Sequence, residues 1–462
     1  MSNIIEQNNR EPKAKDERMA SGAENTGAGI KPSGGKHTIQ EVISWVSYNF
    51  GNAGFPAVVA AAIFNAYFVE TVCGGANIPK GEATLLWTLA VGLSNFLVVV
   101  SAPILGALCD WGGAKRKVLI LATLFCVTCT ALLYFALPGT VTFTFALITL
   151  SYFAFSTGEN IIASFLPDIC EPENMGKVSG MGGMISHLGG LLVLGGCLAY
   201  VQYAKTLSQL PQQYVPVLVL FVAVVYAIFA APSFFYLKEH RQARPLPAGQ
   251  NYLSLGFGRV ASTLKQTTHF QDLLRLLTTI LSYTCGTSTV VVLAAVYAKE
   301  VMGFTMSDNI TMFMVINLTA TGGAYLFGYI QDKIGSKNTL MIALATWLIS
   351  ILVLYSSADK LVFWIAASLL GAANGGTFVA GRAAVGQFAP AGRAGEFFGL
   401  WGLSCKFAAI IGPICYGIIA YLSHGDHRLA ILSTAAFFGI ALVLAFTIND
   451  KRGRQAALSY SE

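Results

Sequence analysis

The chain has 462 residues and a net charge of +6, and 55% of its residues are hydrophobic while only 11% are charged. A soluble globular domain carries about 25% charged residues, so this composition excludes a single soluble core. Apolar stretches of about 20 residues or more, the length that crosses roughly 30 Å of hydrocarbon, recur along almost the whole sequence. We therefore predict an all-α integral membrane protein.

The first 40 residues differ from the rest in being charged and rich in Gly and Ser. They lack the short apolar core of a signal peptide. Because such a composition cannot bury a core, residues 1–40 are predicted to be a disordered cytoplasmic tail.

Apolar stretches separated by polar breaks predict twelve transmembrane helices in the rest of the chain. They lie near residues 42–69, 84–109, 117–137, 140–166, 178–203, 214–237, 271–298, 309–330, 338–356, 361–388, 396–422 and 429–448. The first six spans form an amino-terminal bundle at 41–237, and the last six form a carboxy-terminal bundle at 271–449. A cytoplasmic linker loop at 238–270 joins the bundles, and a cytoplasmic tail follows at 450–462. Within the linker, Leu253 to Leu264 suits either a short amphipathic helix on the membrane surface or a plain connector.

The distribution of basic residues orients the spans. An even number of spans places both termini on one side of the membrane. Twenty-one of the 29 lysines and arginines lie in the two tails and in the loops on that side, whereas five lie in the opposite loops. Since loops rich in Lys and Arg stay in the cytoplasm, both termini are predicted to be cytoplasmic.

One short motif follows both the second and the eighth predicted span. Each copy reads Gly-x3-Asp-x2-Gly followed by a basic residue, and the two copies are displaced by 222 residues, about half the chain: Gly106, Asp110 and Gly113, then Gly328, Asp332 and Gly335. Glycine permits close helix approach and a tight turn, and Asp can accept hydrogen bonds from helix amino-terminal amides. The repeat predicts two similar halves with a conformational hinge in each.

These two copies resemble the loop signature of the major facilitator superfamily. Trp111 and Ala114 stand where that signature usually carries basic residues, which puts part of the charge relay of the first half in doubt. The resemblance implies two pseudo-symmetric six-helix bundles around a central cavity, with alternating access by rocking of the halves.

Further segments are similar to the vacuole-effluxer-like branch of this superfamily, which includes fungal vacuolar amino-acid effluxers linked to autophagy. The segments lie around Trp45 to Asn52, Phe165 to Ile169, Val178 to Gly182 and Gly392 to Gly399. Asn49 departs from the Asp that we expect in that branch. The resemblance implies amino-acid efflux.

Few ionisable residues lie well inside the predicted spans, where each costs at least about 2.5–3.5 kcal/mol. Glu159 and Arg382 both lie roughly 10 Å below the cytoplasmic surface, and Arg382 is the pseudo-symmetric counterpart of Asn160. The pair could close the cytoplasmic side as a gate, or it could be a static contact that only helps folding.

Lys406 and His187 are placed near the midplane, in the eleventh and fifth spans. An ammonium group there suits the carboxylate of an amino acid or another small anion. His187 suits either a coupling role or a hydrogen-bonded helix contact. If transport is coupled to protons, Glu159 is the first candidate carrier and His187 the second.

The first span offers neutral polar groups that can bind a substrate without titrating, on Tyr48, Asn49 and Asn52. Tyr48 and Asn52 are four residues apart and share a helix face. Helix packing explains the two asparagines equally well.

The sequence contains no Walker motif, metal-ligand cluster or nucleophile elbow, which argues against an ATP-driven pump or an enzyme and predicts no metal or cofactor. We expect a monomeric secondary transporter in a bacterial inner membrane whose partners are a small-molecule substrate and the lipid bilayer, with no nucleic acid. Amino-acid export leads; the alternatives are transport of drugs, siderophores or sugars, or a transport-inactive receptor with the same fold.

Overall fold

A computed structural model describes residues 39–169, 175–239, 251–254, 256–258, 270–357, 359–388 and 394–459. The described residues belong to one compact unit, His37–Glu462. The predicted tail lies outside them except for Ile39 and Gln40, which begin the first helix.

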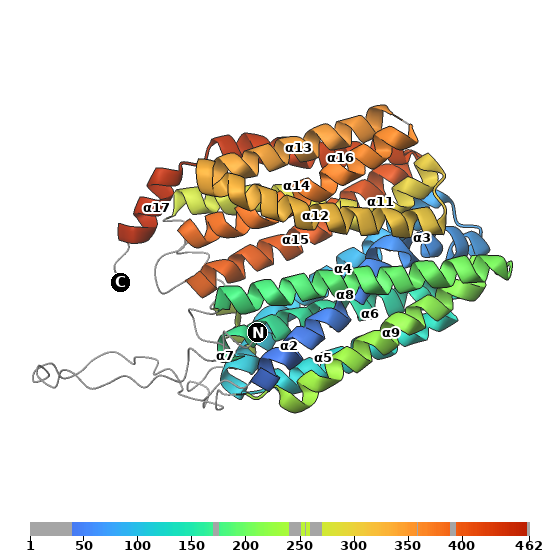
Figure 1. Cartoon of the computed structure of the whole chain (residues 1–462), viewed down its shortest axis with the longest axis horizontal. Helices are drawn as coiled ribbons and strands as arrows, with labels where there is room; N and C mark the ends of the chain where they lie inside the picture. Colours follow the sequence, from blue (N-terminus) through green and yellow to red (C-terminus); the bar gives the residue numbers. More distant parts are fainter. Residues whose placement is uncertain are drawn as a thin grey trace, which may run out of the picture. The chain divides into compact units, whose positions relative to one another are not determined.

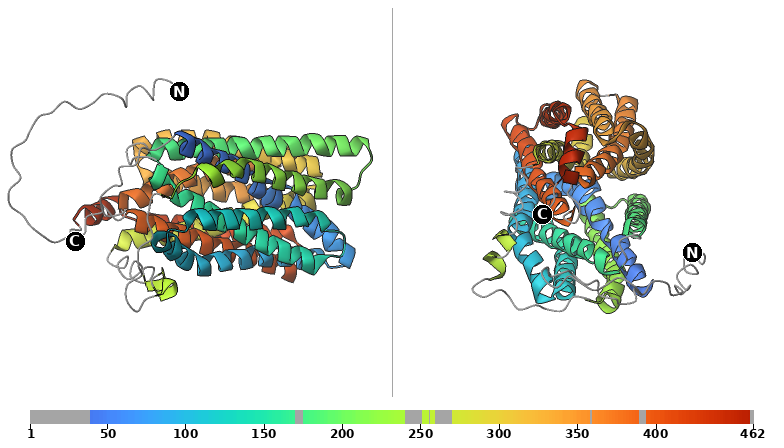
Figure 2. Two further views of the ribbon diagram at one scale, coloured as in Figure 1. Left: turned by 90° about the horizontal axis from the view of Figure 1, so that it is seen from below. Right: turned by 90° about the vertical axis from the view of Figure 1, so that its left-hand side faces the viewer.

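The described residues form helices joined by short turns, without a β-strand. The first half contains α2 (Ile39–Asn52), η2 (Phe55–Ala62), α3 (Phe64–Tyr67), η3 (Phe68–Val72), η4 (Gly74–Ala76), α4 (Lys80–Gly112), α5 (Lys115–Leu132), η5 (Leu133–Phe135), α6 (Val141–Ser164), α7 (Leu166–Ile169), α8 (Met175–Thr206) and α9 (Pro211–Tyr236). The second half contains α11 (Gln271–Met302), α12 (Met306–Ile334), α13 (Ser336–Ser356), α14 (Lys360–Phe388), α15 (Ala394–Leu422), α16 (His427–Phe446) and α17 (Asp450–Ser459). The helices of the two halves run side by side in two groups (Figures 1 and 2).

Eleven of these helices are long and apolar enough to cross a membrane, and a bent pair, Ile39–Ala62 with Phe64–Ala76, supplies the twelfth span. The predicted all-α fold is therefore confirmed. The predicted number of twelve spans is confirmed when the bent pair is counted as one span.

The first span is broken, although the sequence predicts one continuous helix over 42–69. It bends by 41° at Ile63, whose φ of −126° departs from helical geometry. The N–H of Ile63 bonds to the carbonyl of Val58, five residues back, within the π-helical stretch η2. Pro56 at the start of η2 has no N–H to donate, so the regular i to i−4 hydrogen-bond pattern is interrupted at Pro56.

Close helix packing in the second half depends on glycine. A Cβ on Gly375 of α14 would lie 2.1 Å from the carbonyl oxygen of Ala320 on α12, and one on Gly323 would lie 2.3 Å from that of Ala372. No side chain fits at such distances, so these glycines allow the backbones of α12 and α14 to touch.

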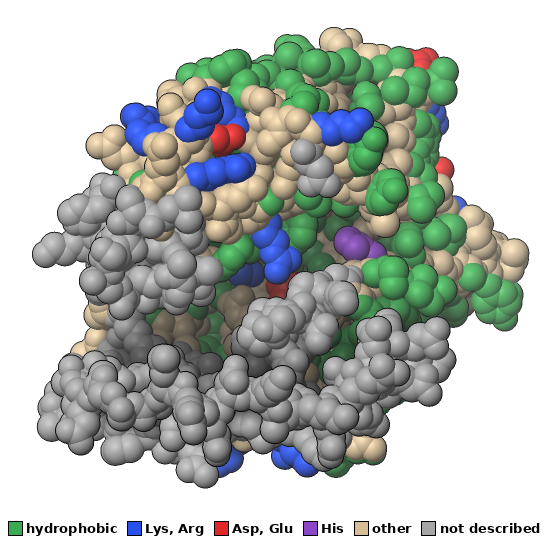
Figure 3. Space-filling model, turned by 60° about the vertical axis from the view of Figure 1, so that its left-hand side comes forward, with side chains coloured by type: hydrophobic (Ala, Val, Ile, Leu, Met, Phe, Trp, Pro, Cys, Tyr) green, Lys and Arg blue, Asp and Glu red, His purple; other side chains and the backbone are tan. Residues whose placement is uncertain are grey.

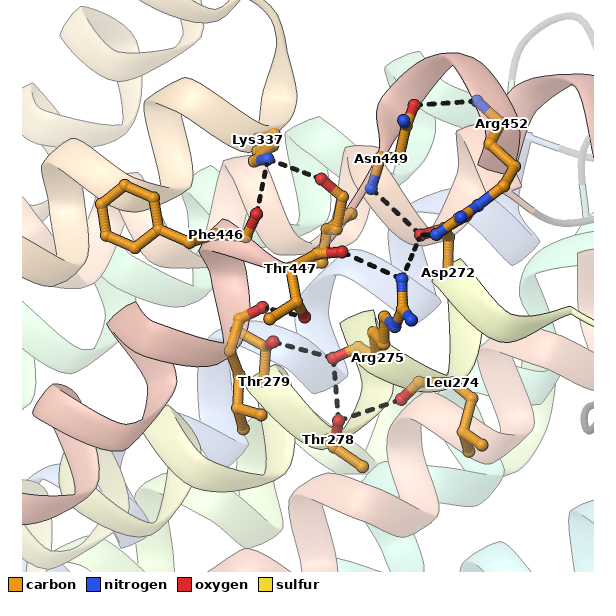
Figure 4. A network of polar contacts seen from close by, with 12 residues as sticks. Asp272, Leu274, Arg275, Thr278, Thr279, Lys337, Phe446, Thr447, Asn449 and Arg452 are labelled. Atoms are coloured by element: carbon orange, nitrogen blue, oxygen red, sulfur yellow. Dashed lines mark hydrogen bonds and ion pairs between the residues drawn. The ribbon is translucent and has the colours of Figure 1, made fainter.

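The short helix α17 is tied to the start of α11 by a polar network (Figure 4). The guanidinium of Arg452 forms a two-pronged ion pair with Asp272, and the Asp272 carboxylate also accepts the N–H of Asn449 at 3.0 Å. The hydrogen bond to Asp272 raises the pKa of Arg452 above its usual range, so the guanidinium stays charged. Gly453 packs against the ring of Phe388, which joins α17 to α14 as well.

Candidate functional site

The glycines that end the two signature copies both have a positive φ, but they differ in ψ, which is 43° at Gly113 and 164° at Gly335. Gly113 follows α4 with φ of +58°, and Gly335 follows α12 with φ of +84°. These are the left-handed values that glycine adopts without strain. The side chains of Asp110 and Asp332 lie outside the described residues, so their predicted hydrogen bonds remain predictions.

The basic residue after the first signature lies in a buried ion pair. Lys115 donates to Asp168 at 2.6 Å, and both side chains are almost completely buried. Lys115 also donates to the carbonyl of Ser164, and its ammonium lies over the ring of Phe165. The contact joins the hinge signature to the Phe165 to Ile169 segment, a link that sequence spacing could not show.

The equivalent residue of the second half, Lys337, binds backbone carbonyls and not a carboxylate among the described residues. Its ammonium donates to the carbonyls of Phe446 and Ile448 at the end of α16. Carbonyls at the last turn of a helix have no partners within the helix, and a cation there also favours the negative end of the helix dipole. Both signature lysines therefore fasten neighbouring helix ends.

The candidate substrate groups of the first span lie inside the first half. Tyr48 is fully buried and its hydroxyl contacts those of Thr123 at 3.0 Å and Tyr226 at 2.8 Å. Asn49 is half-buried and donates to the carbonyl of Trp45, and Asn52 is 4% exposed. The burial of Asn52 fits the helix-packing alternative, and substrate binding by these residues stays a prediction.

Lys406 lies at the boundary between the halves. Its ammonium on α15 is 3.4 Å from the hydroxyl of Ser156 on α6. The side chain is half-buried, and no carboxylate among the described residues pairs with it. Because an unpaired charge inside a span is costly, Lys406 remains a candidate for binding an anion.

The other candidate residues within the spans are exposed in the protein: Glu159, Asn160, His187 and Arg382. Among the described residues Glu159 and Arg382 form no ion pair with each other, and Arg382 instead lies over the ring of Phe378. Glu159 is one helical turn from Ser156, so it shares the face that meets Lys406. Charged groups facing lipid would be costly, so we expect these side chains to line a water-filled cavity rather than to face lipid.

The space-filling view shows such a hollow (Figure 3). Basic and acidic side chains meet on its wall with a histidine close by, and apolar surfaces lie on either side. A separate apolar cavity lies within the second half, lined by residues such as Leu293, Ile316, Ile351 and Leu370, and carries no charged side chain. The charged hollow is therefore the candidate site.

We call the end of the helices at which α2 begins and α17 lies the terminal face, and the end at which α11 ends and α12 begins the sealed face. Strong packing between the halves joins α4 to α15 and α8 to α12. Polar contacts between the halves lie toward the sealed face: Lys80 with Glu300, Lys299 with Glu70, and Lys205 with Ser307. The helices that carry Glu159 and Arg382, α6 and α14, do not pack together in this way.

Asn65 adds a contact between the halves deeper in the membrane. It is fully buried beside the bend of the first span, and its amide donates at 2.8 Å to the carbonyl of Val292 on α11. Among the described residues, the polar contacts between the halves thus gather toward the sealed face, while α6 and α14 do not pack together. Figure 2 shows the same two groups of helices end-on.

A family model described as "Vacuole effluxer Atg22 like" matches residues 82–458, which is most of the chain. The chain belongs to the vacuole effluxer Atg22-like family. The match confirms the family resemblance of the sequence motifs.

The curated relatives of this Atg22-like protein include a bacterial protein described as a transporter and fungal autophagy-related proteins. It is 24% identical over 411 residues to the uncharacterized MFS-type transporter YxiO of Bacillus subtilis, across 88% of this chain and 94% of YxiO. It is 23% identical over 309 residues to autophagy-related protein 22-1 of Aspergillus niger, across 62% of this chain. The match spans only 49% of that fungal protein.

Solved structures show the same fold. A D-xylose–proton symporter matches with a TM-score of 0.68 at 13% identity, over 90% of this chain and 98% of that one. The nucleoside transporter NupG matches with a TM-score of 0.65 at 12% identity, over 88% and 98%. The family match, the similarity to the MFS-type transporter YxiO and the shared fold together support a major facilitator-type secondary transporter.

Proposed function

We propose that this Atg22-like protein exports a small carboxylate-bearing solute, an amino acid or a similar metabolite, by alternating access. The carrying observation is the 3.4 Å contact between Lys406 on α15 and Ser156 on α6, in which the ammonium has no carboxylate partner among the described residues. A carboxylate bound there would contact both halves at once. The binding energy could therefore favour one arrangement of the halves over another.

Glu159 supports a zwitterionic substrate. It lies one turn from Ser156 on the exposed face of α6 and has no cationic partner among the described residues. In the proposed complex Lys406 binds the carboxylate and Glu159 accepts hydrogen bonds from the ammonium. We include Arg382 and His187, which are exposed on α14 and α8, in the same proposed site, and Glu159 is then also the first candidate for a coupled proton.

The proposed orientation places the terminal face in the cytoplasm of a bacterium, with the tails and basic loops on that side. The bias of lysine and arginine toward those segments supports it. The separated halves then give the hollow access to the cytoplasm, which is the state that loads an exported solute.

Thermal unfolding of the purified full chain tests the substrate class. The probes are amino acids, small monocarboxylates and sugars, with each acid compared with its own amide. A bound ligand at about 100 times its dissociation constant adds about 2.7 kcal/mol to stability. We expect an acid to stabilise the protein and its amide to do so much less.

Lys406→Gln should lose that stabilisation without a loss of folding, and Lys406→Arg should retain part of it, because Arg keeps the charge in another shape. Lys451→Gln, at an exposed position on α17, is the matched control. If Lys406→Gln binds the stabilising acid as well as the parent does, the carboxylate site is elsewhere. Stabilisation by sugars alone would favour sugar transport instead.

A further inference from the structure

The interface between α4 and α15 is closely packed toward the sealed face. A Cβ on Gly81 of α4 would lie 2.6 Å from the carbonyl oxygen of Ala420 on α15. A Cβ on Gly417 of α15 would lie 3.3 Å from the Cα of Leu85 and would overlap the hydroxyl of Thr88. These residues therefore mark the sides on which the two helices face each other.

The same side of α4 can be followed to the terminal face. Eighteen residues make about five turns of an α-helix, so residues that far apart lie on one side. Pro103 follows Leu85 by 18 residues, Gly106 follows Thr88 by 18, and all four lie in α4. Pro103 and Gly106 thus belong to the side of α4 that faces α15.

The facing side of α15 continues in the same way. Gly399 precedes Gly417 by 18 residues, and Gly402 precedes Ala420 by 18. No described atom lies within 4 Å of a Cβ built on Gly399, Gly402 or Gly106. The two helices are therefore apart toward the terminal face, although both present glycines that would allow a close approach.

The linker between the halves covers part of this side of α4. We call its helical residues, 252–254 and 256–258, the linker helix, which lies at the terminal face (Figure 2). Gly256 is buried, and a Cβ on it would lie 2.6 Å from the carbonyl carbon of Pro103 and 3.2 Å from the nitrogen of Ile104. The backbone of the linker helix therefore touches the backbone of α4. Tyr252 adds a second contact, since a Cβ on Gly112 would lie 3.3 Å from its hydroxyl.

The start of the linker helix is fixed by its own sequence. The side chain of Asn251 accepts the N–H of Ser254 at 2.8 Å, and the hydroxyl of Ser254 accepts the N–H of Asn251 at 3.1 Å. This reciprocal pair is the capping-box arrangement, which satisfies two amides that a helix start leaves without partners. The linker helix thus presents Gly256 to α4 as an ordered element.

We propose that the linker helix binds the side of α4 that α15 needs in order to close the terminal face, and so holds the two halves apart there. Gly256 brings the linker backbone against Pro103, which leaves no room for a second helix at that point. The linker helix and α15 therefore compete for one side of α4. Release of the linker helix favours the state in which the terminal face is closed.

The direction of this effect follows from the contacts. A bound segment shifts an equilibrium between two states only by the difference in its binding free energy for them. The linker helix can contact Pro103 only while α15 is away from that part of α4. All of the free energy of this contact therefore favours the state that is open at the terminal face.

Distances between spin labels on the full chain in lipid nanodiscs test the proposal. The labels replace Lys117 on α5 and Lys451 on α17, two exposed residues toward the terminal face in different halves, and are attached through unnatural amino acids. No substrate is added, so the result does not depend on the proposed carboxylate site. Gly256→Leu places a side chain where the backbone of Pro103 lies. We expect it to raise the fraction of molecules with the shorter distance at least about threefold.

Gly258→Leu is the matched control, because a Cβ there meets no described atom within 4 Å, and it should behave as the parent does. Tyr252→Ala removes the second contact without adding bulk and serves if Gly256→Leu does not fold; it should raise the same fraction. Hydrogen–deuterium exchange of the peptide spanning residues 251–258 reports release of the linker helix.

The proposal is overturned if this exchange rises in the variants while the distances stay those of the parent. It is also overturned if neither Gly256→Leu nor Tyr252→Ala increases the exchange, or if Gly258→Leu shifts the distances as much as Gly256→Leu does.

Discussion

At the scale of single residues, Lys115 of the first half forms an ion pair in which both charged side chains are buried. Its ammonium is buried against the carboxylate of Asp168 at 2.6 Å. Removing one partner of a buried pair leaves an uncompensated charge, which typically costs about 3–5 kcal/mol, whereas removing both costs much less.

We predict that Lys115→Ala lowers the free energy of unfolding by about 3–5 kcal/mol, and that adding Asp168→Asn recovers a large part of this loss. Chemical unfolding of the purified variants measures both effects. Lys117→Ala, two residues away and exposed, is the control and should change stability by less than about 0.5 kcal/mol. Equal effects of Lys115→Ala and Lys117→Ala would show that the pair contributes little.

The sequence identifies which ionisable residues lie within spans, but not what each one contacts. Lys406 stands out because a lysine inside an apolar span is costly. Its neighbour Ser156 is 250 residues away, and no local pattern connects them. For Tyr48, the sequence shows that a hydroxyl group is present. It does not show that this hydroxyl forms hydrogen bonds with those of Thr123 and Tyr226.

At the scale of elements, some glycines of α12 and α14 lie where the two helices touch, and others do not. A Cβ on Gly375 would meet the backbone of Ala320, whereas a Cβ on Gly322 would meet nothing within 4 Å. The sequence presents both as members of glycine pairs, and only the packing distinguishes them.

Gly375→Ala should therefore destabilise the protein by roughly 1–3 kcal/mol, since the two helices must separate to admit the methyl group. Gly322→Ala should leave stability unchanged or raise it by up to about 1 kcal/mol, because alanine favours helix. Thermal unfolding of the two variants beside the parent measures the difference. An equal effect at both positions would contradict the contact between α12 and α14.

The span boundaries follow from hydrophobicity, but the break in the first span does not. Pro56 interrupts the hydrogen-bond ladder, yet a proline in a membrane helix can also leave it continuous. Next to the bend at Ile63, the amide of Asn65 donates to the carbonyl of Val292 in the other half. Contacts of this kind arise only once the halves meet.

At the scale of the whole molecule, the internal repeat predicts the two halves, and the structure adds the state in which they are arranged. The halves meet near the sealed face and separate near the terminal face. Sequence alone cannot select this state, because alternating states differ by only a few contacts and a few kcal/mol.

In the opposite state we predict that Glu159 and Arg382 approach and pair, since the terminal ends of α6 and α14 must then come together. Glu159→Gln and Arg382→Ala should each reduce transport at least about tenfold. The charge-exchanged double variant, Glu159→Arg with Arg382→Glu, should recover part of it, as measured by solute flux into proteoliposomes. Simple addition of the two losses without recovery would mean that the residues act separately.

The most direct test of the account is solute flux itself. Proteoliposomes containing the parent are preloaded with an acid that stabilises the protein, and entry of the labelled acid is followed by counterflow. We predict saturable entry that Lys406→Gln reduces at least about tenfold and Lys451→Gln leaves unchanged. Binding of the acid with no entry above that of protein-free liposomes would contradict transport and identify the protein as a receptor with this fold.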